Sequence, residues 1–512
     1  MPSAGLVLPL IALIGVIACS ITEPSRSSAQ IEELADEYVN LRLQYDPALA
    51  REIGVRDASD MHFPDRSPAA LADLRSHEDT IVTKLKAIGG AGTKDFEPTY
   101  SVLVEELESR RGLRVCRSEL WDLSQMEGWQ IEMPSLAATQ PVATPDERRR
   151  ALRLWSTLPA YLQTDMANLR AGLASGYSVP RAVVTRVLEQ LERLLAATPE
   201  DCPFYLPAKR AKDPAFANAL REEISVQINP AIERYADFLR SEYLPEARTS
   251  LGMSDLPNGS ACCRAYLERY TTTHDSPELV FEAGKKIVAE STKEIQSIGA
   301  RLYQTTKMAE IVQRSHEDPN NRFNSSAQLI QFSRAMVERS EGRSHALFFQ
   351  LPSQAVIVKA LPEYQRGSGV SSHYQPNQND EEPATFWIST DDWADETRGA
   401  TEITAVHETV PGHHLQIATA RRLQPATKLA KLVYNSAYVE GWANYAERLS
   451  EETSYEMGGL EILSLREEAR KRLGTKFDLR AFHQAVLEQG SIPLSALRAS
   501  IENWIESSLA TR

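Results

Sequence analysis

The sequence predicts a mainly α protein, and three observations lead to this class. Hydrophobic residues recur at helical spacing through most of the chain beyond residue 30. Prolines and glycines stand at the ends of these periodic runs, where they begin and end helices. Runs of β-branched residues are confined to residues 355–390. With 512 residues, 42% of them hydrophobic, the chain is long enough to bury a large core.

The first 29 residues are expected to be a targeting leader and not part of the fold. Leu6 to Ala18 form an apolar segment that is short for a transmembrane span. Val16-Ile17-Ala18-Cys19 resembles a bacterial lipobox, in which the cysteine becomes the lipidated N-terminus, although the residues before it include no Lys or Arg. Ser27-Ser28-Ala29 offers an alternative cleavage site. We therefore expect either a lipoprotein on the periplasmic side of a bacterial cell envelope or a secreted protein.

Helical segments are expected from residue 31 to residue 303, and each has its own start or stop signal. The expected helices are a run through Ile31, Leu34, Tyr38, Leu41 and Tyr45 that ends before Pro47, a block over 146–176 closed by Gly176, a helix over 180–197 with proline in its first turn, a block over 213–248 kinked or broken at Pro230, and a helix opened by Ser276-Pro277-Glu278 that runs to about Tyr303.

Charge and cysteine content restrict the partners. Lys and Arg total 56 against 70 Asp and Glu, so the net charge is −14 and no basic block is present. Nucleic acid is therefore not expected as a partner, and membrane contact is expected only through a lipid on Cys19. The four other cysteines allow three disulfide pairings, and we expect them to act as small buried hydrophobic residues. They are Cys116, Cys202, Cys262 and Cys263.

Residues 403–449 hold the parts of a metal site. His407-Glu408 is followed by Pro411-Gly412-His413-His414 and, on a downstream helical run, by Glu440. Two histidines, a carboxylate ligand and a second carboxylate beside the first histidine are the parts of a hydrolytic zinc site. In the HExxH signature both histidines project from one face of a helix. Here proline stands where the second histidine would fall.

Pro411 also gives the physical reason why a wider spacing can work. On an unbroken helix, His413 would lie roughly 9 Å along the axis from His407, too far to share an ion whose bonds are about 2.1 Å long. Pro411 lacks the N–H that would bond the carbonyl of His407, and Gly412 permits unusual dihedral angles. We therefore expect the extra residues to bulge out and return His413 to His407. His414, about 10 Å along the axis, is the alternative ligand.

The helix that contains Glu440 is expected to supply the third ligand, while Asn444 and Glu447 on the same face could orient ligands. His-Glu pairs also occur at 77–78 and 316–317, and we interpret both as surface pairs. A His-Glu pair alone is therefore weak evidence, and it is the combination of His407-Glu408 with His413 and Glu440 that indicates a metal site. The buried stripe of the same helix is expected to comprise Tyr438, Trp442, Tyr445 and Leu449.

Two sequence segments, HETVPGHHLQ (407–416) and YVEGWANYAERL (438–449), resemble the signature of the bacterial DUF885 proteins. These are regarded as zinc metallopeptidases related in fold to the helical HExxH carboxypeptidases and oligopeptidases. The resemblance extends over nearly all of the chain after the leader. Further similar segments are 120–130, 198–207, 243–249 and 465–497.

The resemblance implies a large, mainly α, metallopeptidase-like body with a deep cleft and a small β-element beside the metal-site helix. It implies one domain over 30–512, with an N-terminal helical lobe at about 30–310 and a metal-site lobe at about 311–512. Within the β-element, the β-branched runs 355–361 and 384–390 are the expected strands. By the same resemblance, 384–390 would be an edge strand that binds substrate backbone, and a plain supporting hairpin is the alternative.

Carried over by position, the resemblance makes His407, His413 and Glu440 the ligands of Zn²⁺ and Glu408 the general base. In the related peptidases a glycine-histidine pair carries the second ligand, which favours His413 over His414. The oxyanion of a peptidase needs a stabiliser besides zinc. Tyr455 matches a family tyrosine and is the first candidate, followed by His483 and Tyr374, and a structural hydrogen bond is the alternative role for each.

One departure from the family bears on activity. Family members carry a long helical stretch between the segments that correspond to 440–452 and 453–469, and these two are nearly fused here. We expect an exported zinc peptidase acting on peptide substrates. The alternative is a catalytically impaired family member that serves as an envelope binding or scaffolding protein, because the missing stretch would contribute to the substrate cleft.

Overall fold

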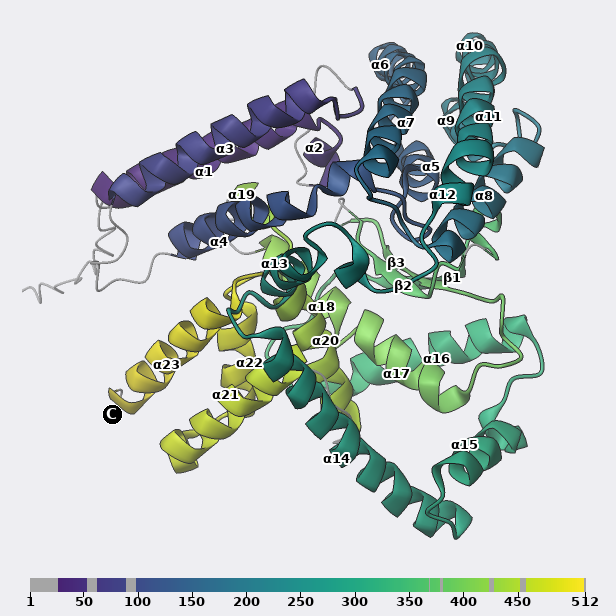
Figure 1. The fold of residues 1–512 in the computed structure, drawn as a ribbon. Coiled ribbons are helices and arrows are strands. Elements are labelled where there is room, and N and C mark those ends of the chain that lie inside the picture. Colours follow the sequence, from purple (N-terminus) through teal and green to yellow (C-terminus); the bar gives the residue numbers. More distant parts are fainter. Residues whose placement is uncertain are drawn as a thin grey trace, which may run out of the picture.

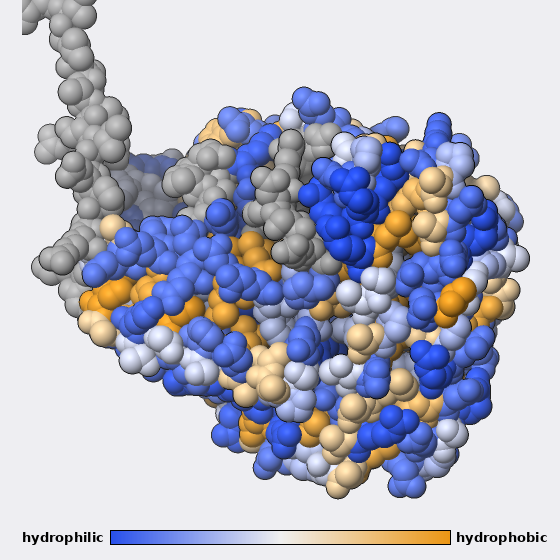
Figure 2. All heavy atoms as spheres, turned by 90° about the horizontal axis from the view of Figure 1, so that it is seen from above, coloured by the Kyte–Doolittle hydropathy of each residue, from blue (hydrophilic) through white to orange (hydrophobic). Residues whose placement is uncertain are grey.

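The computed structural model describes residues 26–52, 62–88, 98–367, 369–377, 381–422, 428–451 and 457–510. Within these ranges the fold is mainly α with one small sheet, as the sequence predicts (Figure 1). No helix in these ranges is both long and apolar enough to cross a membrane. In the view of Figure 2 the surface is largely hydrophilic, with hydrophobic residues in separate patches. Residues 1–25 of the expected leader, with Cys19 among them, lie outside the described residues. Residues 26–29 begin α1, so the expectation that they are not part of the fold is wrong.

The N-terminal helices form a layer in which α1 and α3 lie side by side (Figure 1). Glu78 of α3 is 2% exposed and pairs with Arg110 and Arg114 at 2.7 and 3.1 Å. The interpretation of 77–78 as a surface pair is therefore wrong for the glutamate, whereas both residues of 316–317 are exposed. The helices of the layer are α1 (Arg26–Tyr45), α2 (Leu49–Glu52), α3 (Pro68–Ile88) and α4 (Pro98–Leu113).

A second helical bundle follows, with a core of its own. The predicted blocks at 146–176 and 180–197 are helical, and Gly176 ends the first with a φ of 80°. At Pro230 the chain neither kinks sharply nor breaks. A π-helical turn over Ile224–Ile228 directly precedes α11 and accommodates the proline. The bundle comprises α5 (Trp129–Thr139), α6 (Pro145–Ser156), α7 (Leu158–Ala174), α8 (Arg181–Ala196), α9 (Leu206–Ala211), α10 (Pro214–Glu223), α11 (Asn229–Phe238) and α12 (Leu244–Glu246).

The middle of the chain is tied back to the N-terminal layer by a disulfide between Cys116 and Cys262. These two are therefore not free hydrophobic residues as expected, whereas Cys202 is free and buried and Cys263 is free and exposed. The predicted helix from residue 277 is confirmed, and the Ser276 hydroxyl caps it by accepting from the N–H of Leu279. The helices here are α13 (Gly259–Thr271), α14 (Pro277–Tyr303), α15 (Met308–Glu317) and α16 (Ser326–Ser344).

The small sheet has three strands, β1 (Val356–Ala360), β2 (His373–Gln375) and β3 (Ala384–Ile388), in the order β1-β3-β2. The two strands expected from the sequence are β1 and β3. They pair in parallel and so form no hairpin. The short β2 pairs with β3 in antiparallel fashion. Because β3 is central, both of its edges are occupied, and the expectation that it is a substrate-binding edge strand is wrong.

The C-terminal helices surround α20. Of its predicted stripe, Tyr438, Trp442 and Tyr445 are 0% exposed and Leu449 is partly buried. One hydrophobic core joins this region to α1, α3 and α4, so helices from both sides of residue 310 pack together. The expected deep cleft stays a prediction. The helices are α17 (Arg398–Glu408), α18 (His413–Arg422), α19 (Lys428–Leu432), α20 (Ser436–Glu451), α21 (Met457–Leu473), α22 (Leu479–Leu487) and α23 (Leu494–Ala510).

Candidate metal centre

The histidine motif lies where one helix stops and another starts. Helix α17 ends at Glu408, a cis peptide joins Val410 to Pro411, and α18 begins at His413. The extra residues therefore form a full break between two helices and not a bulge within one. The predicted result is nevertheless obtained, because the ring centroids of His407 and His413 lie 4.7 Å apart.

Gly412 is required at this break by the close approach of the backbone. Its N–H donates to the carbonyl of Val406 at 3.2 Å. A Cβ atom at this position would lie 1.9 Å from the carbonyl oxygen of His407, far inside van der Waals contact. The absence of a side chain thus lets the chain fold back on the end of α17 and carry His413 towards His407.

Helix α20 is held against the break by a buried hydrogen bond. The indole N–H of Trp442 donates to the carbonyl of Pro411 at 2.8 Å. Trp442 lies on the buried stripe of α20, and Glu440 lies two residues earlier on a half-exposed face. The tryptophan therefore fixes the distance between α20 and the break, and with it the position of the Glu440 carboxylate relative to both imidazoles.

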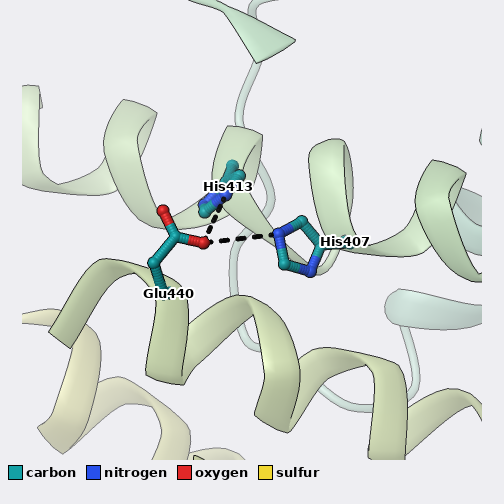
Figure 3. Close-up of side chains that lie close together, drawn as sticks. All are labelled: His407, His413 and Glu440. Carbon is teal, nitrogen blue, oxygen red and sulfur yellow. Dashed lines mark ion pairs between the residues drawn. The ribbon is translucent and has the colours of Figure 1, made fainter. Parts of the chain in front are cut away.

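The three predicted ligands converge. Oε2 of Glu440 lies 3.6 Å from Nε2 of His407 and 3.6 Å from Nε2 of His413 (Figure 3). Within the described residues these are the three side chains whose ligand atoms all fall within 4.8 Å of one another. Tetrahedral zinc with bonds of about 2.1 Å separates its ligand atoms by roughly 3.4 Å. The donor set and its spacing therefore fit zinc after small side-chain movements.

A second carboxylate orients the first histidine. Nδ1 of His407 donates to Oε1 of Glu447 at 2.7 Å, as the sequence predicts for a ligand-orienting residue. The side-chain amide of Asn444 donates to the backbone carbonyl of Glu440 at 2.9 Å, and its expected part in orienting ligands stays a prediction. Nδ1 of His413 is buried and has no hydrogen-bond partner among the described residues.

Charge is concentrated at this site. Burial lowers the pKa of His407, but its ion pair with Glu440 and its hydrogen bond with Glu447 outweigh burial and raise the pKa to about 10. Burial raises the pKa of Glu440, yet His407, His413 and Tyr434 together hold it well below the usual range. The carboxylate of Glu440 is therefore charged across the physiological range, as a cation ligand requires.

His414 points away from the candidate ligands and is 1% exposed. Its Nε2 lies 2.8 Å from the carbonyl of Gln354, so this nitrogen carries the proton. Its Nδ1 then accepts the hydroxyl proton of Tyr374 at 2.9 Å. Burial lowers the pKa of His414 to about 4, which keeps the ring neutral. Because both nitrogens are used elsewhere, the geometry favours His413 as the second ligand.

Glu408, the expected general base, lies beside His407 and is 9% exposed. Its Oε2 accepts from the backbone N–H of Tyr374 in the edge strand β2 at 2.8 Å. Burial raises the pKa of Glu408, although His413 and His407 oppose the rise. A carboxyl group with a raised pKa is suited to taking up and releasing a proton near neutrality.

Two of the three oxyanion candidates, His483 and Tyr374, have side chains that are hydrogen-bonded elsewhere. His483 is 0% exposed in the core, where Nδ1 donates to the carbonyl of Leu347 at 3.0 Å and Nε2 accepts from Tyr445 at 2.8 Å. Its burial and its two hydrogen bonds favour the alternative of a structural role, and a catalytic role stays a prediction. The hydroxyl of Tyr374 is bonded to His414. Tyr455 lies outside the described residues.

Sequence reasoning missed Tyr434. Its hydroxyl donates to Oε1 of Glu440 at 2.8 Å, and the residue is 54% exposed. Tyr434 precedes α20 in a segment without helical periodicity, and no spacing rule connects it to the metal motif. The contact depends on how the chain turns into α20, so it becomes visible only in three dimensions.

The fold and the site together define a class: a mainly α protein in which two imidazoles, from α17 and α18, and a carboxylate from α20 converge beside a second carboxylate. The chain belongs to DUF885, a family described as "Bacterial protein of unknown function (DUF885)", whose model matches residues 47–453 and 452–501. The two matches meet where the sequence predicts a family stretch to be missing.

Two solved structures share the fold. A "putative lipoprotein" from Colwellia psychrerythraea aligns with a TM-score of 0.83 and 19% identity, over 94% of this chain and 99% of that one. A "putative lipoprotein of unknown function" from Shewanella oneidensis aligns with a TM-score of 0.63 and 15% identity, over 92% of this chain and 99% of that one. No curated protein matches this chain.

Proposed function

We propose that this protein is an exported zinc-dependent peptidase that hydrolyses peptide bonds with Glu408 as general base. The observation that carries the proposal is the convergence of one Glu440 oxygen on the Nε2 atoms of His407 and His413, at 3.6 Å from each, with Glu408 next to the first histidine. Two neutral imidazoles and one carboxylate are a ligand set of catalytic zinc sites.

His407, His413 and Glu440 would hold the metal. When bound, zinc supplies a Lewis acid that polarises a carbonyl oxygen and lowers the pKa of water. The protein contributes the orientation of its ligands, because Glu447 holds the proton of His407 on Nδ1 and leaves Nε2 free to bind. Trp442 contributes rigidity by tying α20 to the break between α17 and α18.

Glu408 is placed to move the proton. Its Oε2 is held by the N–H of Tyr374, and its Oε1 makes no hydrogen bond within the described residues. Oε1 is therefore the oxygen available to take a proton from the attacking water and pass it to the leaving amine. The raised pKa of Glu408, caused by burial, favours both halves of this transfer near neutral pH.

Export and substrate class are part of the proposal. The leader predicted over residues 1–29 supports an envelope lipoprotein or a secreted protein, and both structural relatives carry the description "putative lipoprotein". The acidic net charge of −14 is unsuited to nucleic acid, so peptides are the proposed substrates.

The test uses the chain without its leader. Bound metal is measured by mass spectrometry of the elements, and cleavage of a peptide mixture is compared between wild type and Glu408→Gln. The matched control is Glu317→Gln, which alters the exposed His-Glu pair of α15. We expect about one zinc per chain in all three proteins and a loss of about 100-fold or more in cleavage rate for Glu408→Gln alone.

Two outcomes would overturn the proposal. A wild-type protein that binds no zinc has no metal centre. A protein that binds zinc but cleaves none of the peptides, with or without Glu408, would instead be the binding or scaffolding protein that the shortened region after Ser450 suggests.

A further inference from the structure

The two oxygens of the Glu440 carboxylate have different neighbours. Oε2 faces Nε2 of His407 and Nε2 of His413, at 3.6 Å from each. Oε1 accepts a hydrogen bond from the hydroxyl of Tyr434 at 2.8 Å. One oxygen is thus directed at the metal position, while the other is held by a neutral donor.

The Glu440 side chain needs such a restraint. It is 45% exposed, so packing alone does not select one orientation of the carboxylate. The side-chain amide of Asn444, on the same face of α20, donates to the backbone carbonyl of Glu440 at 2.9 Å. Among the described residues, Tyr434 is the group that bonds Oε1.

Tyr434 is itself held in place through the next residue. The N–H of Asn435 donates to the hydroxyl of Ser491 at 3.0 Å. The side-chain oxygen of Asn435 caps α20 by accepting from the N–H of Tyr438 at 3.2 Å. The backbone beside Tyr434 is therefore fixed to both α20 and the segment before α23. This holds the Tyr434 hydroxyl close to Glu440.

We propose that Tyr434 is a positioning residue that keeps Glu440 a one-oxygen ligand and thereby preserves an open coordination position for water. The inference rests on the proposed function and deepens it. A carboxylate can bind a metal through one oxygen or through two, and binding through two would occupy the position that a catalytic zinc site leaves open. The Tyr434 hydroxyl opposes the second mode because Oε1 would have to give up its hydrogen bond.

The test replaces Tyr434 with phenylalanine in the chain without its leader and loads each protein with Co²⁺. The visible absorption of Co²⁺ is intense in four-coordinate sites and several-fold weaker at higher coordination number. The matched control is Tyr270→Phe, because Tyr270 is also 54% exposed and lies on α13. We expect an intense spectrum for wild type and Tyr270→Phe, and a several-fold weaker one for Tyr434→Phe. Zinc stoichiometry should be unchanged and peptide cleavage should fall.

The alternatives give different results. An intense spectrum in Tyr434→Phe, equal to that of Tyr270→Phe, would overturn the positioning role even if cleavage fell. A weak spectrum already in wild type would overturn it as well. If wild type binds neither Co²⁺ nor zinc, the metal centre itself fails. If it binds both but cleaves no peptide, only the proposed peptidase function fails, and the spectra still decide the role of Tyr434.

Discussion

Nδ1 of His407 and Oε1 of Glu447 lie 2.7 Å apart, and because a carboxylate can only accept, the imidazole donates. This bond keeps one proton on Nδ1, so that Nε2, which faces Glu440, is the nitrogen that would give up its proton to a metal. Glu447, seven positions after Glu440 on α20, thus orients His407 on α17. The metal centre depends on this pairing as well as on the three groups that would touch the ion.

Replacing Glu447 with glutamine should weaken zinc binding by about 10- to 100-fold, because the neutral amide supports the tautomer and the basicity of His407 less well. The affinity can be measured by competition with a chromophoric chelator. Glu502→Gln, at an exposed position of α23, is the control. Equal zinc affinities in the two variants would show that Glu447 does not orient His407 for metal binding.

Replacing His413 and His414 with alanine, one at a time, should affect zinc binding differently. His413→Ala should abolish tight zinc binding, since it removes a ligand. His414→Ala should keep one zinc per chain but lower the free energy of unfolding by about 1–3 kcal/mol, because it removes the buried hydrogen bonds with Tyr374 and Gln354. Elemental analysis and urea unfolding separate the two effects. Loss of zinc in His414→Ala alone would reverse the assignment of the second ligand.

Gly412→Ala should disturb the break between α17 and α18, because the added Cβ would lie 1.9 Å from the carbonyl oxygen of His407. We expect a loss of about 1–3 kcal/mol in stability together with weaker zinc binding. Gly342→Ala is the control, since that glycine lies within α16 with nothing within 4 Å of an added Cβ. There the substitution should stabilise by up to about 1 kcal/mol. Equal unfolding midpoints would contradict the steric argument.

Cys262→Ser should destabilise the protein by about 2–4 kcal/mol, since the disulfide with Cys116 closes a loop across 146 positions of the chain. Cys263→Ser is an adjacent control, because that cysteine is free and exposed. Urea unfolding under oxidising conditions compares the two variants with wild type. A destabilising Cys263→Ser and a neutral Cys262→Ser would mean that the pairing is wrong.

The buried His483 should make the metal-free protein sensitive to acid. Burial lowers the pKa of His483 from the ordinary value of 6.5 to about 4. Between these values the unfolded chain binds more protons than the folded one, so stability falls as the pH drops from 6.5 towards 4. The full loss from this group is about 3 kcal/mol.

His483→Gln should flatten this pH dependence, and His316→Gln, at an exposed position of α15, should leave it unchanged. Part of the slope should remain in His483→Gln, because burial also lowers the pKa of His414 to about 4. The measurement is the free energy of unfolding in urea at several pH values in the presence of a chelator. Identical slopes for the two variants would contradict the account.

The sequence alone predicted the mainly α class, the limits of several helices such as α8 and α14, and the three residues that converge at the candidate metal centre. Helical period and caps are local properties, as at Ser276, and they depend on few distant contacts. The lack of an N–H in Pro411 is likewise local, so the end of α17 and the return of His413 could be foreseen. Glu440 could be chosen because three polar residues share one face of its helix.

The tertiary structure alone decided the order of the strands, the disulfide pairing and the hydrogen-bond partners of His483 and Tyr434. A parallel pair and a third short strand differ from a hairpin only in long-range contacts, which leave no local pattern in β1 and β3. His483 is buried by residues distant in sequence, and Tyr434 meets Glu440 through the turn into α20. Such contacts depend on how whole helices pack, and that packing is a property of the complete chain.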